Sequence, residues 1–347
     1  MKPRQEHPQK EDDDLLPRQD TTQNLELRSK RTERQRRKRE KKAGSLTRAA
    51  SDTQLLLGLP VELLTAILEL LRPSDLLALA RTSRVLHGFI FANEADLARR
   101  VIRLRYPILE QCFLRPVLMR DIDAAIQPLL QGSYRADLAG IQQWPFARIS
   151  IPSPDYALHC TCLTCLGRWN ALCVVVDFAH WQDVLDNGEP IPDIAPGTSP
   201  KWNQDLLART RRIVLAALTS PLRYARLLEV HLESTRRSVL RHSRNKTDRR
   251  PHYRMTTDMA ETDAFLGQKG PPTVEFPYSR EVYYLLEAFL PTRSWLTSQQ
   301  RWGYIQRPDE WHQLDLDLLV RMVSLNRASQ DAHVDQDSAA TEGNRRC

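Results

Sequence analysis

Four of the six cysteines in this 347-residue chain lie within fourteen residues of one another, beside two histidines: Cys160, Cys162, Cys165, Cys173, His159 and His180. The Cys162-x-x-Cys165 spacing is that of half a structural zinc site, because zinc takes four thiolate or imidazole donors that usually come as two close pairs. No second close Cys or Cys/His pair follows downstream. Zinc at Cys160, Cys162, Cys165 and Cys173 is therefore an alternative that a metal analysis of the purified chain would settle.

The same stretch has the pattern of a buried helix face. Cys162, Trp169, Cys173, Val176 and His180 recur at helical spacing, as small and apolar side chains do when they pack in a core. We expect core packing, no bound metal and no cofactor. A thioredoxin-like redox role is less favoured, since no strand is evident before the Cys-x-x-Cys motif.

The chain offers little that resembles a catalytic site. It has no Gly-x-Ser-x-Gly elbow, no phosphate-binding Gly-rich loop and no His-Glu-x-x-His motif. Asp177 and His180 lie three positions apart on an expected helix, but no nucleophile or metal partner accompanies them. We expect a helix-surface pair or a buried hydrogen bond here, and a protein that is not an enzyme.

The net charge of +7 comes almost entirely from residues 1–50, which carry 15 Lys or Arg and 9 Asp or Glu but no Trp, Tyr or Phe. Such a segment buries too little apolar surface to fold, so residues 1–52 are expected to be a disordered tail. A dense basic run within it has the composition of a nuclear-import signal: Lys30, Arg31, Arg36, Arg37, Lys38, Arg39, Lys41 and Lys42. A solvated helix is the alternative. A charge confined to a tail argues against nucleic-acid binding by the body, which would need a basic face on a folded domain.

No secretory signal and no apolar run of about 20 residues is found, so we expect no membrane contact and a location inside the cell, in the nucleus and/or the cytoplasm.

The first part of the chain that is expected to fold is an apolar module of short helices at residues 53–92. Pro60 and Glu62 favour a helix start, and Pro73 ends that helix. Ser74 and Ser83 are candidate caps of two further helices. Three short helices with so many leucines cannot bury every apolar side chain among themselves, so part of their surface should face a partner.

The module carries one specific pattern at Leu59, Pro60, Glu62, Leu63, Leu64, Ile67, Leu68, Asp75, Leu76, Leu77, Thr82, Ser83 and Arg84. In order and spacing this pattern resembles the F-box motif of ubiquitin-ligase substrate receptors. The resemblance implies an SKP-type adaptor and a cullin scaffold as partners, an unknown protein substrate, and chemistry that belongs to other subunits. The expected adaptor-binding residues are Leu59, Pro60, Leu63, Leu64, Ile67, Leu68 and Leu76. The alternative is a set of ordinary core helices in a larger helical protein.

The remainder of the chain is expected to be helical too, which makes the fold class mainly α-helical. Residues 93–139 should form a helical connector, residues 140–325 a helical domain that binds the substrate, and residues 326–347 a disordered tail. Helices are expected at about 206–218, 222–242, 282–290 and 314–325, separated by Pro-rich loops. All seven tryptophans follow residue 143 and should anchor the core of that domain.

A second resemblance concerns residues 168–181 and 200–203. Their arrangement of Arg-Trp-Asn, Asp-Phe-Ala-His-Trp and Pro-Lys-Trp-Asn segments resembles the body of many fungal F-box proteins. The function implied by both resemblances is that of a substrate receptor in a cullin-RING ligase of the SCF type. The rival interpretation is a nuclear zinc- or nucleic-acid-binding protein that uses the basic tail and the Cys160 to Cys173 cluster.

Overall fold

The computed structural model describes residues 33–39, 58–131, 151–187, 189–192, 194–195, 197–244, 254–257, 259–267, 292–305 and 310–325. The chain divides into two units, Met1–Pro60 and Val61–Cys347. In the first unit, residues 33–39 form an exposed helix in which Arg37 pairs with Glu33 at 3.1 Å. Arg36, Arg37, Lys38 and Arg39 of the basic run lie on this helix. Lys30, Arg31, Lys41 and Lys42 lie outside the described residues.

The second unit begins with four short helices: α2 (Val61–Leu68), α3 (Pro73–Leu79), α4 (Arg84–Ala92) and α5 (Glu94–Arg105). Pro73 is the first residue of α3, where the missing N–H of proline costs no hydrogen bond. Ser83 caps α4 as predicted, because its Oγ accepts a hydrogen bond from the backbone N–H of Val85 at 3.3 Å. Ser74 does not cap α3, since Arg72 occupies the cap position.

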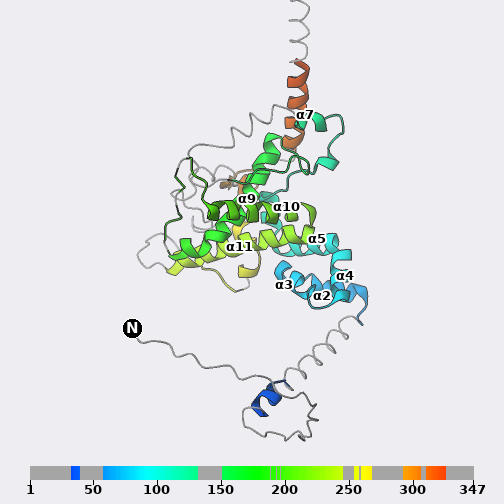
Figure 1. Ribbon diagram of the computed structural model, residues 1–347, viewed down its shortest axis with the longest axis vertical. Helices are drawn as coiled ribbons and strands as arrows, with labels where there is room; N and C mark the ends of the chain where they lie inside the picture. The colour runs from blue at the N-terminus through cyan, green and yellow to red at the C-terminus, as the bar shows by residue number, and fades with distance from the viewer. Residues whose placement is uncertain are drawn as a thin grey trace, which may run out of the picture. The chain divides into compact units, whose positions relative to one another are not determined.

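Three long helices form the centre of the unit: α9 (Leu163–Asn187), α10 (Lys201–Thr219) and α11 (Pro221–Arg244) (Figure 1). They pack against one another, and α11 also contacts α3, α5 and α6 (Pro107–Cys112). One face of α11 is buried at Leu222, Ala225, Leu228, Leu232 and Val239. A mainly helical fold is thereby confirmed, and α3, α5, α6, α9 and α10 all pack against α11.

The smaller elements are α7 (Gln127–Gln131), the 3-10 turns η1 (Met119–Asp121), η2 (Met259–Glu261) and η3 (Ala264–Gly267), and an antiparallel hairpin of β1 (Thr292–Leu296) and β2 (Arg301–Ile305). The hairpin was not predicted. Its register pairs Trp295 with Trp302, two residues with high strand propensity. Residues 310–325 form a final helix, drawn in orange in Figure 1 and called helix 310–325 below.

A second, smaller core lies where helix 310–325 meets the start of α9. Its buried members are Met119, Ile122, Leu130, Cys160, Cys162, Cys165, Leu316 and Leu319. Three stretches that are far apart in the sequence therefore share one apolar cluster. In Figure 1 the orange helix accordingly lies beside α7 and the first turns of α9.

The tryptophans have two different environments. Trp169 and Trp181 are buried, whereas Trp202 and Trp311 are exposed by 38% and 47%. The expected helix at 282–290 and the tail at 326–347 lie outside the described residues. The proposed division into a module, a connector and a substrate-binding domain stays a prediction. Among the helices that the structure describes, none combines the length and the apolar character needed to cross a membrane.

Candidate functional site

Helix α2 presents an apolar stripe to the solvent. Leu63 and Ile67 are exposed by 54% and 41%, and their four-residue spacing places them about 40° apart around the axis of α2. The chain continues past the end of α2 in tighter turns, in which the N–H of Leu70 donates to the carbonyl of Ile67 at 3.2 Å, and Leu70 is exposed by 60%. Three large apolar side chains on α2 and in the turn after it are therefore open to solvent.

Another face of α2 points into the protein. Leu64 is 3% exposed and Leu68 is fully buried, as is Leu76 on α3. These three belong to the seven residues expected to bind the adaptor, but their side chains are buried within the chain and not accessible to a partner. Pro60, Leu63 and Ile67 are exposed, and Leu59 is partly exposed.

Acidic side chains fix these helices to distant parts of the fold. Both carboxylate oxygens of Glu229 on α11 accept hydrogen bonds from Ser74, one from its N–H at 2.8 Å and one from its Oγ at 2.6 Å. Glu94 on α5 accepts a hydrogen bond from the N–H of Leu222 at 3.1 Å, at the start of α11. Free N–H groups at helix starts need acceptors, and a carboxylate also complements the helix dipole. The first helices are therefore held firmly against α11.

Asp263 makes the same kind of contact with α6. Its Oδ2 accepts hydrogen bonds from the N–H groups of Ile108 and Leu109, both at 2.8 Å. Burial raises the pKa of the Asp263 carboxyl to about 7. Arg105, whose side chain is largely buried, donates to the carbonyl of Leu70 and pairs with Glu261 at 3.2 Å. The turn after α2 is thus tied to the segment around η2.

A cleft of about 460 Å³ opens between α3, α9, α10 and α11. It is lined by apolar residues and by four arginines: Leu77, Val176, Leu206, Ile213, Leu227, Val230, Arg81, Arg209, Arg223 and Arg226. Leu77 comes from α3 and Arg81 from the turn after it, and the others come from the helical centre. No sequence motif indicates this cleft, because its lining is assembled from separate segments between residues 77 and 230.

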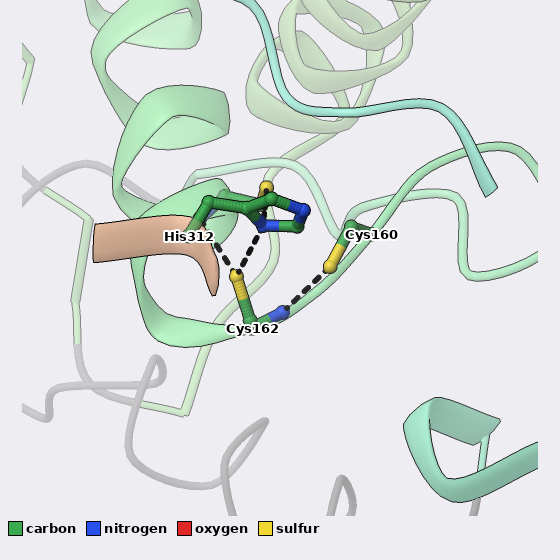
Figure 2. A group of neighbouring side chains, drawn as sticks. Cys160, Cys162 and His312 are labelled. Carbon is green, nitrogen blue, oxygen red and sulfur yellow. Dashed lines mark hydrogen bonds between the residues drawn. The ribbon is translucent and has the colours of Figure 1, made fainter. Parts of the chain in front are cut away.

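The structure places a histidine from a distant helix beside the cysteine cluster. The Nδ1 atom of His312 lies 3.3 Å from Cys162 Sγ and 3.4 Å from Cys165 Sγ. Figure 2 shows His312, on helix 310–325, pointing into the loop that carries Cys160 and Cys162. One potential ligand atom from each of Cys160, Cys162, Cys165 and His312 lies within 4.8 Å of all the others. In the sequence His312 is a single histidine without a close Cys or His neighbour, so the spacing of metal-ligand pairs does not reveal it.

Cys173 and His159 lie near this cluster in sequence but are engaged elsewhere. Cys173 lies further along α9, where burial raises the pKa of its thiol. His159 uses both ring nitrogens, Nδ1 with the carbonyl of Cys160 at 2.8 Å and Nε2 with the N–H of Asp155 at 3.2 Å, and it stacks on Trp169. Neither residue belongs to the set of four potential ligands.

Asp177 and His180 have different environments in the structure. Asp177 is buried, and burial raises the pKa of its carboxyl to about 7. His180 is exposed at the rim of the cleft, and its pKa is lowered by partial burial and by the charge of Arg209.

Comparison with known proteins identifies one region. No curated protein and no solved structure matches the chain. Residues 56–102 match the family model described as F-box-like, a range that includes α2, α3 and α4 and extends to Ile102 in α5. The exposed stripe of Leu63 and Ile67 and the buried Leu64 and Leu68 all lie inside that match. The chain therefore carries an F-box-like domain at residues 56–102.

Proposed function

We propose that the chain is a non-catalytic substrate receptor of a cullin-RING ubiquitin ligase of the SCF type. The observation that carries the proposal is the exposed stripe of Leu63, Ile67 and Leu70 inside the F-box-like match. An amphipathic helix with an open apolar face is suited to a hydrophobic groove on a partner. In this role α2 binds an SKP-type adaptor, and the cullin and the conjugating enzyme are brought by the adaptor.

The buried residues have a different part in this proposal. Leu64, Leu68 and Leu76 hold the F-box-like helices on the body, and Pro60, Leu63 and Ile67 are left to make the contact with the adaptor. A small number of central apolar anchors usually carries most of the binding free energy of such an interface. The contact at Glu229 and Ser74 then keeps the body at a fixed orientation to the adaptor.

The cleft between α3 and the long helices is the surface that we propose for the target protein. Its apolar lining suits a short hydrophobic segment, and Arg81, Arg209 and Arg223 favour acidic side chains or phosphate groups on that segment. Since Leu77 and Arg81 belong to the F-box-like domain, a target bound here lies next to the adaptor-binding helices.

The test is a calorimetric titration of the full chain with the purified adaptor. We expect the double variant Leu63→Ala, Ile67→Ala to remain folded and to lose about 30-fold or more in affinity, which corresponds to roughly 2 kcal/mol at a buried anchor pair. Leu104→Ala is the matched control, because Leu104 is 49% exposed but lies beyond the matched residues. No binding by the wild type, or equal binding by the double variant, contradicts the proposal.

The basic run from Lys30 to Lys42 is proposed as a nuclear-import signal for this receptor. Replacing Arg36, Arg37, Lys38 and Arg39 by alanine should move a fluorescent fusion from the nucleus to the cytoplasm. An unchanged distribution contradicts this part of the proposal.

A further inference from the structure

Four soft donor atoms from two distant segments meet at one point of the smaller core. Cys160, Cys162 and Cys165 come from the loop and first turn of α9, and His312 comes from helix 310–325. In a tetrahedral zinc site, Zn–S distances of about 2.3 Å and Zn–N distances of about 2.0 Å put neighbouring donor atoms roughly 3.5 to 3.8 Å apart. The 3.3 and 3.4 Å separations of His312 Nδ1 from Cys162 Sγ and Cys165 Sγ are close to that geometry.

The surroundings hold the sulfur atoms in place. The N–H of Cys162 donates to Cys160 Sγ, and the N–H of Cys165 donates to Cys162 Sγ, each at 3.4 Å. Backbone N–H groups directed at sulfur stabilise a thiolate and orient it toward a metal. The loop itself is fixed, because the N–H of Cys160 donates to the carbonyl of Val117 at 2.8 Å.

We propose that Cys160, Cys162, Cys165 and His312 bind a structural zinc ion. Three thiolates and an imidazole are a donor set that favours zinc over harder cations, and four protein donors leave no open position for catalysis. Binding releases the thiol protons to solvent and joins helix 310–325 to the start of α9. The site does not depend on the adaptor contact proposed above.

The zinc ion would stabilise the contact between helix 310–325 and α9. The core between helix 310–325 and α9 has eight buried members, three of which are the cysteines themselves. Asp315 also connects helix 310–325 to α9, because its Oδ2 accepts a hydrogen bond from the N–H of Thr164 at 2.7 Å. A core this small needs an additional staple, as small domains generally do. Zinc provides that staple at one end of helix 310–325.

Two simpler interpretations compete with zinc. One is a cluster of thiols that only fill space in the core, and the other is a disulfide within the Cys-x-x-Cys motif. A disulfide requires the two sulfur atoms to approach to about 2.05 Å, and no disulfide joins Cys160, Cys162 and Cys165 in the structure. Neither interpretation requires a histidine at this position.

The experiment measures zinc in the full chain, purified in reducing buffer without chelator. We expect about one zinc per chain in the wild type and in Cys173→Ser, and almost none in Cys165→Ser and His312→Ala. Cys173 is the matched control, since it is a buried cysteine of the same helix outside the cluster. A wild-type chain without zinc after reconstitution, or a Cys165→Ser variant with wild-type zinc content, overturns the proposal.

A second measurement covers the case in which a variant fails to fold. Cobalt added to the metal-free wild type should give the intense visible absorption of a tetrahedral ion and a thiolate charge-transfer band, and zinc should abolish both. His312→Cys should retain the metal and shift these bands, because a fourth sulfur replaces nitrogen. The weak absorption of an octahedral cobalt ion, or identical spectra for the wild type and His312→Cys, overturns the assignment.

Discussion

Glu229 accepts two hydrogen bonds from Ser74, although the two residues are 155 positions apart in the sequence. The glutamate also pairs with Arg226 at 3.2 Å, and its side chain is only 9% exposed. Helix α3 of the F-box-like domain is therefore joined to α11 by a nearly buried carboxylate. In the proposed receptor role such a rigid link would make the orientation of a bound target follow that of the adaptor.

Removing this carboxylate should destabilise the fold. Glu229→Ala leaves Ser74 and Arg226 without their acceptor, so we expect the free energy of unfolding to fall by about 2 kcal/mol in urea titrations. Glu233→Ala is the control, because Glu233 lies on the same helix and is exposed. Equal stability of the two variants would show that the contact contributes nothing.

The two faces of α2 should respond to mutation in opposite ways. Leu68→Ala empties a fully buried site and should lower stability by about 3 kcal/mol. Leu63→Ala removes an exposed side chain and should change stability by less than about 0.5 kcal/mol, while it weakens adaptor binding. Thermal unfolding and adaptor titration of both variants check this separation. Loss of stability in Leu63→Ala would place that side chain in the core.

His231 should make the protein sensitive to acid. Burial lowers its pKa to about 3, below the value of about 6.5 for an unfolded chain. The unfolded state therefore takes up the proton first, and stability that is complete above pH 6.5 is lost as the pH falls toward 3. Between pH 7.5 and pH 5 the protonation of His231 should lower the free energy of unfolding by about 2 kcal/mol. His231→Gln should remove that part of the loss, whereas His87→Gln, at an exposed position, should not.

Asp177 should act in the opposite direction. Burial raises its pKa to about 7, well above the ordinary value of 3.8. The folded state then binds the proton more tightly, so stability is complete below pH 3.8 and is lost as the pH rises toward 7. Asp177→Asn should raise stability at pH 8 by up to about 4 kcal/mol, the equivalent of that pKa shift. A variant that is less stable than the wild type at pH 8 would show that the carboxylate has a stabilising partner.

Charge reversal in the cleft should separate target recognition from adaptor binding. Arg209→Glu with Arg223→Glu should leave adaptor affinity unchanged and reduce the ubiquitination of target proteins, because acidic segments are then repelled. Arg212→Glu is the control, since Arg212 is exposed on α10 but does not line the cleft. Quantitative proteomics of ubiquitinated peptides in cells that express each variant is the measurement. An unchanged set of targets would move the binding surface elsewhere.

Local elements can be predicted from the amino-acid sequence alone. A helix was expected at about 222–242, where the structure has α11 (Pro221–Arg244), and Ser83 was expected to cap a helix, which is α4. The F-box pattern was readable for the same reason, because Pro60, Leu63, Leu64 and Ile67 lie within one short segment. Helix periodicity and capping depend on residues that are close together in the chain, so the amino-acid sequence is enough to predict them.

Which side of each helix is exposed and which distant residues meet depend on the packing of the whole fold. Leu63 and Leu64 were both expected to bind the adaptor, but the packing of α2 left the first exposed by 54% and buried the second. His312 reached the cysteines, and Glu229 reached Ser74, through the packing of helices that are about 150 residues apart in the sequence. Such contacts are set by the burial of whole helix faces, which depends on every other element of the fold and leaves no local pattern in the sequence.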